Sequence, residues 1–171
     1  MMDLKEYIRD VEDFPKPGVG FKDITPLLDS KEALSESLKR FLKLIEGKNI
    51  NKVVAMESRG FFFGPLIAYE IGAGFIPVRK PGKLPYKTYK QEYALEYGTD
   101  VLEMHVDAIS AGDKVLIHDD VLATGGTAEA VVKLVEKAGG EVVQLDFLID
   151  LTFLNGKSKL EGYDVNALIE Y

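Results

Sequence analysis

Two adjacent acids, Asp119 and Asp120, stand at the end of an apolar run that begins at Val115. A short turn of small and hydroxyl residues, 123–127, follows, and a helical pattern begins at Ala128. Backbone N–H groups at a helix N-terminus bind phosphate, because they are unpaired donors at the positive end of the helix dipole. The carboxylates just upstream can accept hydrogen bonds from the hydroxyls of a sugar. The run therefore predicts a site for a phosphorylated ribose.

Each half of this run also has a simpler interpretation. The acids could bind a metal or remain solvated, and the turn could serve only to cap the helix through Thr127. The complete run is more specific, and it resembles the phosphoribosyl pyrophosphate signature of the type I phosphoribosyltransferases. The resemblance implies that Asp119 and Asp120 bind the ribose hydroxyls. It also implies that the 5′-phosphate lies on the loop formed by Ala123, Thr124, Gly125, Gly126 and Thr127. His118 replaces an expected apolar strand residue, which we expect to alter packing or a hydrogen bond rather than the chemistry.

Composition indicates an ordinary globular protein. The chain has 171 residues, which suit a single domain (1–171) with a sizeable core. It has no cysteine, which excludes disulfides and thiolate catalysis. The net charge of -7 makes it a poor general binder of nucleic acid, because phosphate contacts supply most non-specific affinity. No apolar run has the length of a membrane span, and the N-terminus lacks the apolar core of a signal peptide, so we expect a cytoplasmic protein without a membrane segment.

Strand and helix patterns alternate along the chain, which predicts a mainly parallel sheet with right-handed crossovers. Strands are expected at residues 52–56, 74–79, 101–106, 114–117, 141–151 and 165–169. Helices are expected at residues 3–13, 31–46, 61–71 and from Ala128 to the Gly139-Gly140 pair. Residues 14–28 are too rich in Pro and Gly for a long helix, and residues 80–100 are polar and basic without a core-facing stripe. Parallel sheets bind ligands at the carboxyl ends of their strands, so the loops after 52–56 and 114–117 should share one crevice.

The loop after the strand at 52–56 consists of Glu57, Ser58, Arg59 and Gly60. Its backbone donors and the Arg59 guanidinium could hold a second anion. The alternative is a tight turn in which Ser58 caps the following helix and Arg59 is exposed. A phosphate loop at a neighbouring strand end favours the anion site. In the type I transferases this position is the pyrophosphate loop, whose first peptide bond is often cis without proline.

A basic segment begins at Arg79, Lys80 and Lys83. Most such runs are solvated loops. The functional interpretation is a flexible lid, residues 80–100, whose cations meet a polyphosphate and which excludes water when it closes. Glu96 and Tyr97 lie on the far side of this segment, where Glu96 could also be an ordinary exposed acid.

Three separate pieces resemble the adenine phosphoribosyltransferase family in order and spacing. They are residues 14–28, residues 83–85 with 95–98, and residues 119–127. The resemblance implies the type I phosphoribosyltransferase fold, an α/β fold with a mainly parallel twisted sheet flanked by helices and a small N-terminal hood at residues 1–28. It implies that adenine and 5-phospho-α-D-ribosyl 1-pyrophosphate give AMP and pyrophosphate, with Mg²⁺ neutralising the pyrophosphate. It also implies a homodimer.

The resemblance assigns roles to further residues. Glu96 would assist proton removal from the purine, with Arg59 and Lys83 as the other catalytic groups. Phe21 would stack on the base while the backbone of Gly20 and Lys22 reads its edge. The remaining substrate contacts would come from Glu57, Ser58, Arg79, Lys80 and Tyr97. Mg²⁺ would be held mainly through the substrate, with Asp119 or Asp120 as the candidate protein ligand. Gly20 stands where larger aliphatic residues are common, and Lys22 where arginine is also common.

Two other functions compete with this one. A xanthine or hypoxanthine/guanine phosphoribosyltransferase would share the sugar-phosphate motif but need other groups at the purine edge, and residues 14–28 argue for adenine. A regulator that senses the phosphoribosyl ligand would carry a DNA-binding domain. The acidic charge and the few residues before the hood's base-binding segment argue against the regulator.

Overall fold

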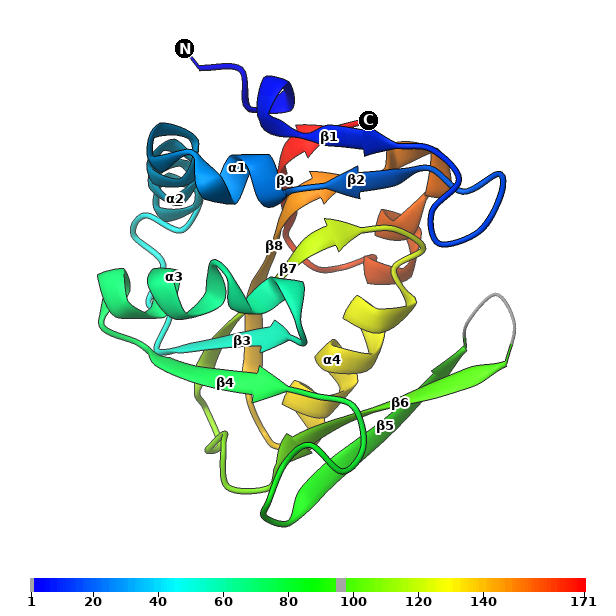
Figure 1. The fold of residues 1–171 in the computed structure, drawn as a ribbon. Coiled ribbons are helices and arrows are strands. Elements are labelled where there is room, and N and C mark those ends of the chain that lie inside the picture. Colours follow the sequence, from blue (N-terminus) through cyan, green and yellow to red (C-terminus); the bar gives the residue numbers. More distant parts are fainter. Residues whose placement is uncertain (1, 95–97) are drawn as a thin grey trace. The chain divides into compact units, whose positions relative to one another are not determined.

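The computed structural model describes residues 2–94 and 98–171. The chain forms two compact units, Met1–Arg40 and Phe41–Tyr171. Figure 1 shows the course of the chain through both units.

A five-stranded sheet with the order β4-β3-β7-β8-β9 forms the centre of the second unit (Figure 1). Every neighbouring pair in it is parallel. Its strands are β3 (Lys52–Met56), β4 (Gly74–Val78), β7 (Lys114–Leu122), β8 (Glu141–Asp150) and β9 (Val165–Glu170). The expected α/β architecture with a mainly parallel sheet is therefore confirmed.

Two helices connect neighbouring strands of this sheet. Helix α3 (Gly64–Ile71) connects β3 to β4, and α4 (Gly126–Lys137) connects β7 to β8. Because β4 and β8 lie on opposite sides of the central β3–β7 pair, right-handed crossovers place α3 and α4 on opposite faces of the sheet, as Figure 1 shows. The strand order thus reverses between β3 and β7. We call this position the switch point, and the crevice between the loops after β3 and β7 the switch-point crevice. Open parallel sheets bind ligands at the carboxyl ends of the strands beside such a reversal.

Both faces of the sheet are covered by apolar side chains. On the α4 face, Ile117 and Phe147 pack with Val131 and belong to one large buried cluster. His118 is fully buried, and its ring lies 4.9 Å from the Phe41 ring in an edge-on contact. Burial lowers the pKa of His118 to about 3, so the imidazole is neutral at physiological pH. This residue contributes to packing, as expected from the sequence.

The lid segment contains more regular structure than its composition suggests. Strand β5 (Thr88–Ala94) pairs antiparallel with β6 (Thr99–His105). The expectation that residues 80–100 lack a core-facing stripe is wrong, because Tyr89 and Tyr93 pack against the core cluster. Polar residues separate these tyrosines, and a strand of this kind is stabilised by its partner strand rather than by its own hydrophobicity.

The first unit corrects a second expectation. Residues 3–13 do not form a helix: a 3₁₀ helix spans Leu4–Tyr7, and β1 (Arg9–Val11) then pairs antiparallel with β2 (Phe21–Asp23). The pairing partner lies about ten residues away, so the local apolar pattern could not reveal it. Helix α1 (Thr25–Asp29) follows, and α2 (Lys31–Leu44) begins in this unit.

Other element boundaries differ from the expected ones by a few residues. Strand β7 continues to Leu122 instead of ending at Ile117, because β8 pairs with it as far as Asp150. Asp119 and Asp120 are therefore strand residues, and the strand pairing restricts their backbone conformation. The remaining short 3₁₀ helices span Arg59–Phe61, Thr152–Leu154 and Gly156–Leu160.

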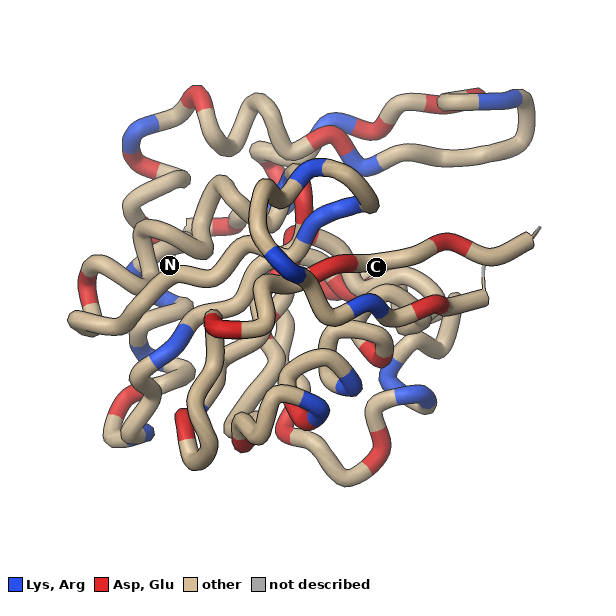
Figure 2. The backbone as a smooth tube through the Cα atoms, turned by 90° about the horizontal axis from the view of Figure 1, so that it is seen from below, with Lys and Arg blue, Asp and Glu red and all other residues tan. Residues whose placement is uncertain are grey.

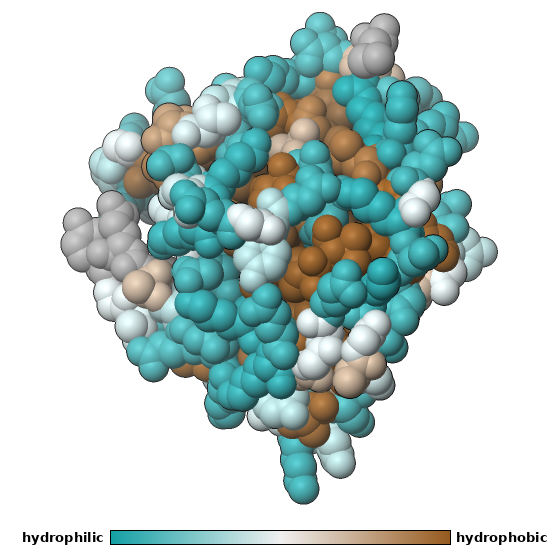
Figure 3. All heavy atoms as spheres, turned by 180° about the vertical axis from the view of Figure 1, so that it is seen from behind, coloured by the Kyte–Doolittle hydropathy of each residue, from teal (hydrophilic) through white to brown (hydrophobic). Residues whose placement is uncertain are grey.

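The surface is mixed in charge and polarity. Lysine and arginine positions are interspersed with aspartate and glutamate positions on the described chain (Figure 2). On the face drawn in Figure 3, hydrophilic side chains surround a smaller hydrophobic area. Within residues 2–94 and 98–171, no helix is both long and apolar enough to cross a membrane.

Candidate active site

The loops after β3 and β7 meet at the carboxyl ends of these strands. The Arg59 Nε atom lies 2.8 Å from the Asp120 Oδ2 atom. Gly60 also approaches β7 closely, because a Cβ atom at this position would lie 3.0 Å from the Asp119 Oδ1 atom. The sequence predicted that these two loops share one crevice. The structure confirms that they are in contact.

The two acids of this crevice are held in unusual surroundings for carboxylates. Asp120 is buried, and the Asp120 backbone N–H donates to the Asp119 Oδ1 atom at 2.9 Å. Burial raises the pKa of Asp119, and the neighbouring Asp120 charge raises it further. Burial also raises the pKa of Asp120, while the Arg59 guanidinium opposes that effect. Hydroxyl groups of a ligand, or a cation, would stabilise the charged form of such a pair by replacing the water lost on burial.

The loop at residues 123–127 leads directly into α4. Gly125 is the N-cap residue with a φ of 79°, and no side chain caps the helix. Thr127 lies inside the first turn, so the alternative in which it merely caps the helix is wrong. The first N–H groups of a helix have no intrahelical partner. Next to them is a cavity of about 70 Å³, lined in part by Asp119, Thr124 and Thr127.

The loop at residues 123–127 packs tightly against residue 156. A Cβ atom on Gly125 would overlap the Gly156 carbonyl oxygen, and one on Gly156 would overlap the Ala123 carbonyl oxygen. Lys157 follows, and its Nζ atom lies 2.9 Å from the buried Asp150 Oδ2 atom. Sequence reasoning did not identify Gly156, because the contact joins segments about thirty residues apart and nothing local marks it.

Cations gather at the carboxyl ends of β3 and β4. The Arg79 Nε atom lies 2.6 Å from the Glu57 Oε2 atom, and the Arg79 side chain also donates to the Lys83 carbonyl oxygen. Lys83 itself is exposed. The Lys80 Nζ atom lies 3.1 Å from the Asp100 Oδ2 atom, and this carboxylate raises the pKa of Lys80. The structure thus brings the predicted basic residues to the same edge of the sheet as Arg59.

The loop between Glu57 and Gly60 agrees with one further expectation. Its first peptide bond, Glu57–Ser58, is cis without proline. Ser58 precedes the 3₁₀ helix Arg59–Phe61 and makes no side-chain capping bond, so the alternative in which it serves as a cap is wrong. Ser58 is instead exposed.

The proposed base-binding residues belong to the first unit. Phe21 and Lys22 lie on β2, directly after Gly20. The Phe21 ring meets the Phe14 ring edge-on with centroids 5.0 Å apart, and the Lys22 ammonium pairs with the Asp10 carboxylate. Two other predicted site residues, Glu96 and Tyr97, lie outside the described residues.

The donor atoms at this edge suit a magnesium ion that is bound together with a substrate. Mg²⁺ prefers oxygen ligands and is usually held by one or two carboxylates plus substrate phosphates. Asp119 and Asp120 supply such carboxylates. No cluster of three or more acidic or histidine residues that could hold a metal occurs in the part of the chain that the structure describes.

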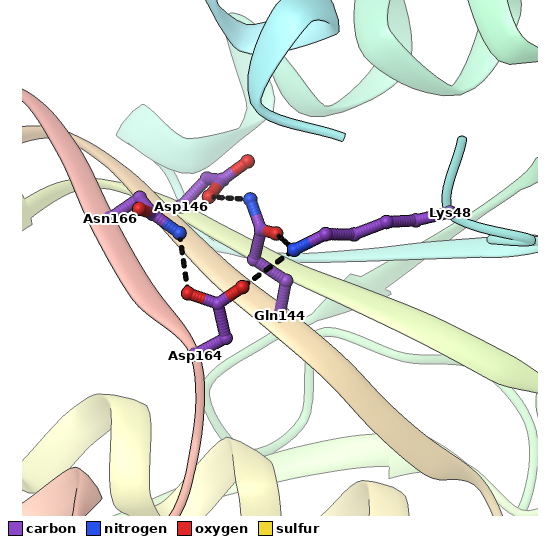
Figure 4. A network of polar contacts seen from close by, with 5 residues as sticks. All are labelled: Lys48, Gln144, Asp146, Asp164 and Asn166. Atoms are coloured by element: carbon purple, nitrogen blue, oxygen red, sulfur yellow. Dashed lines mark hydrogen bonds and ion pairs between the residues drawn. The ribbon is translucent and has the colours of Figure 1, made fainter. Parts of the chain in front are cut away.

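A second polar cluster lies near the amino ends of β8 and β9 (Figure 4). Lys48 pairs with Asp164 at 2.5 Å and donates to the Gln144 side-chain oxygen. Gln144 in turn donates to the Asp146 Oδ1 atom at 2.5 Å, and Asn166 donates to Asp164. Burial raises the pKa of Asp146 to about 7. These five residues, the β8–β9 network, bond mainly to one another and lie away from the switch point.

Comparison with known proteins identifies the family of the chain. Residues 24–162 match the model of the phosphoribosyl transferase domain family. The adenine phosphoribosyltransferase of Christiangramia forsetii is 60% identical over 170 residues, which cover 99% of each chain. The crystal structure of adenine phosphoribosyltransferase from Thermoanaerobacter pseudethanolicus has a TM-score of 0.96 and 52% identity, and the match covers 98% of each chain.

A third relative adds a ligand. The adenine phosphoribosyltransferase of Saccharomyces cerevisiae, crystallised with an imino-altritol bisphosphate and adenine, has a TM-score of 0.88 and 39% identity. The match covers 95% of this chain and 94% of the yeast chain. Residues 24–162, which match the family model, include the loops after β3 and β7. The chain belongs to the adenine phosphoribosyltransferase family of the type I phosphoribosyltransferases.

Proposed function

We propose that this protein transfers the 5-phosphoribosyl group from 5-phospho-α-D-ribosyl 1-pyrophosphate to adenine, releasing AMP and pyrophosphate in purine salvage. The observation that carries the proposal is the crevice between β3 and β7, where an acidic pair and the N-terminus of α4 lie side by side. The family membership supplies the choice of adenine over another acceptor.

The sugar phosphate is bound by the β7 strand and the phosphate loop. The 5′-phosphate accepts hydrogen bonds from the free N–H groups of residues 124–127, with help from the Thr124 and Thr127 hydroxyls. Asp119 and Asp120 accept from the ribose hydroxyls. Because adenine itself is the nucleophile, neither acid has to form a covalent bond.

The leaving pyrophosphate is stabilised by cations. Its charge grows as the bond to C1′ breaks, so fixed positive groups lower the energy of the transition state. Arg59, Arg79, Lys80 and Lys83 are the candidate groups, and Ser58 with the backbone of its loop completes the binding site. When bound, Mg²⁺ adds charge neutralisation at the pyrophosphate.

The base is selected by the N-terminal hood. Phe21 stacks on the purine, which supplies about 1–3 kcal/mol but little discrimination. The backbone of Gly20 and Lys22 reads the purine edge, where a carbonyl that accepts from the amino group of adenine would face the oxygen of a 6-oxopurine. Such an unpaired buried group costs about 1–3 kcal/mol. Glu96 assists removal of the proton from the purine, and Tyr97 contacts the substrate.

A base panel tests the proposal. The protein is assayed with phosphoribosyl pyrophosphate, Mg²⁺ and adenine, hypoxanthine, guanine or xanthine in turn, and nucleotide formation is measured spectrophotometrically. We expect kcat/KM for adenine to exceed the other values by about a hundredfold or more. Equal efficiency with hypoxanthine would refute the adenine assignment. Failure to form a nucleotide with any base would refute the transferase assignment.

We also propose a cytoplasmic homodimer. Both properties are usual for the family, and the chain has no cysteine that would suggest an oxidising compartment. Size-exclusion chromatography with light scattering should give a mass of twice 19.0 kDa. A mass of 19.0 kDa at working concentrations would contradict the dimer.

A further inference from the structure

A lysine from the C-terminal part of the chain lies beside residues 123–127, the proposed phosphate loop. A Cβ atom on Gly126 would be 3.6 Å from the Lys159 Nζ atom. Gly126 is the first residue of α4. Because Cα–Cβ bonds in a helix tilt toward its N-terminus, the ammonium group lies beside the end of α4 where the N–H groups have no intrahelical partner.

The short 3₁₀ helix Gly156–Leu160 explains the position of this lysine. Residues three apart lie on the same side of a 3₁₀ helix, so Lys159 faces the same way as Gly156, against which the loop packs. The other side of the helix is anchored, because Leu160 belongs to the buried core cluster and Lys157 pairs with a buried carboxylate on β8. The fold therefore fixes the backbone from which Lys159 reaches the loop.

The phosphate loop contains no basic residue, although the group that it would bind is an anion. The strand that leads into the loop ends in two acids, Asp119 and Asp120. Arg59 is already paired with one of these acids, and Lys157 is paired with carboxylates on β8 and β9. Lys159 is exposed, and its side chain makes no ion pair or hydrogen bond with the described residues. Its charge is therefore available to a ligand on the loop.

We propose that Lys159 is a further substrate-binding residue, whose ammonium group contacts the 5′-phosphate of phosphoribosyl pyrophosphate and of AMP. This inference rests on the proposed function, in which the 5′-phosphate lies on residues 123–127. An ammonium group donates charge-assisted hydrogen bonds to phosphate oxygens, and these are stronger than bonds from neutral donors. Because the 5′-phosphate does not react, the contact is made in the ground state and in the transition state alike. It should therefore strengthen binding more than it accelerates the chemical step.

The first test compares AMP with adenosine, which lacks the phosphate, by titration calorimetry. Lys159→Met removes the charge and should raise the Kd for AMP by about three- to tenfold, the size expected for one lost hydrogen bond to a charged group at an exposed site. The Kd for adenosine should not change. Lys159→Arg keeps the charge and should retain most of the affinity for AMP.

Lys133→Met is the matched control. Lys133 is also exposed and lies on α4, where it pairs with Glu129, so this variant changes the net charge by the same amount. It should leave the Kd for AMP and the Kd for adenosine unchanged.

The second test uses steady-state kinetics. Lys159→Met should raise the KM for phosphoribosyl pyrophosphate by about the same three- to tenfold and change kcat less than KM. Lys159→Glu places a negative charge beside the phosphate and should raise KM further than Lys159→Met does.

The outcomes separate this inference from the proposed function. A wild-type protein without adenine phosphoribosyltransferase activity would refute the proposed function. An active wild type with an unchanged Kd for AMP in Lys159→Met, or equal changes in Lys159→Met and Lys133→Met, would overturn the role of Lys159. A rise in the Kd for adenosine as large as that for AMP would show that the variant disturbs the structure, and it would also overturn the contact with phosphate.

Discussion

The molecule contains two groups of carboxylates on one sheet, and they differ in the side chains and the open space around them. In the β8–β9 network, Asp164 meets Lys48 and Asn166, and the Asp146 Oδ1 atom accepts from Gln144 (Figure 4). The Asp146 Oδ2 atom has no hydrogen-bond partner among the described residues. In the switch-point crevice, Asp119 and Asp120 meet one guanidinium and lie beside a cavity and the N-terminus of a helix. Each group contains a desolvated acid, and burial raises the pKa of Asp146 as well as that of Asp119.

We infer from this difference that the β8–β9 network serves the fold and that Asp119 and Asp120 serve ligand binding. A buried polar group that bonds to its own protein contributes to a defined fold, whereas one that faces a cavity gains its partners from a ligand. The position of Asp119 and Asp120 agrees with this inference, because they lie toward the carboxyl ends of the strands, where parallel sheets bind ligands. Burial or a raised pKa alone would not distinguish the two groups.

The largest expected effect is on catalysis. Asp120→Asn removes the charge that pairs with Arg59 and that we propose accepts from the ribose, and losing a buried charged partner costs about 2–5 kcal/mol. We expect kcat/KM to fall by roughly a hundredfold or more, with a small change in the unfolding midpoint. Asp146→Asn is the control and should keep kcat/KM within about twofold. Equal losses in the two variants would remove the distinction between the clusters.

A second prediction concerns the packing that supports the open site. Gly125→Ala places a methyl group against the Gly156 carbonyl at a φ of 79°. Strain and overpacking together should lower the free energy of unfolding by about 3 kcal/mol, measured in urea. Gly82→Ala has nearly the same backbone conformation, with a φ of 77°, but open space around the Cβ position. It should lose only about 1 kcal/mol. Equal losses would show that the contact with Gly156 is unimportant.

The third prediction uses pH to probe the β8–β9 network. The folded-state pKa of Asp146 is about 7, above the value of 3.8 for the unfolded chain, so the native state binds the proton more tightly. Its stabilising contribution is complete below pH 3.8 and is lost as pH rises to about 7. Relative to Asp146→Asn, wild-type stability should fall by on the order of 4 kcal/mol over this range. Parallel stability curves for the two proteins would contradict the prediction.

The smallest effect is expected at the edge of the same network. Lys48→Met removes the ion pair with Asp164, whose carboxylate is half exposed, and the hydrogen bond to Gln144. Partly exposed pairs contribute about 0.2–1 kcal/mol, so the midpoint in urea should shift slightly and less so at high salt. Activity should not change. A loss as large as that of Gly125→Ala would show that the network depends on Lys48 far more than its exposure indicates.

The sequence predicted the meeting of the loops after β3 and β7 better than it predicted the antiparallel strand pairs. The segment from Val115 to Thr127 combines an apolar run, paired acids and a glycine turn, and each of these has a local cause. The central strands and most helices were predictable for the same reason, since their apolar periodicity is strong. The β5–β6 hairpin and the β1–β2 pair were not predicted, because their stability comes from partner strands elsewhere in the chain.

Long-range contacts explain the residues that the sequence did not identify. Lys159, Asp100 and Gly156 become relevant only when the chain brings them against the phosphate loop or Lys80. The β8–β9 network was missed for the same reason, because its members come from three separate segments. Paired acids on one strand can be recognised in a sequence. A carboxylate that hydrogen-bonds to side chains from distant segments cannot.

A crystal structure with bound AMP tests the central claim most directly. We expect the phosphate to lie on residues 123–127 within hydrogen-bond distance of their backbone N–H groups, and the ribose hydroxyls to lie against Asp119 and Asp120. The β8–β9 network should be unchanged in the complex. A phosphate bound anywhere else, or a ribose that does not contact either acid, would contradict the assignment of the switch-point crevice as the active site.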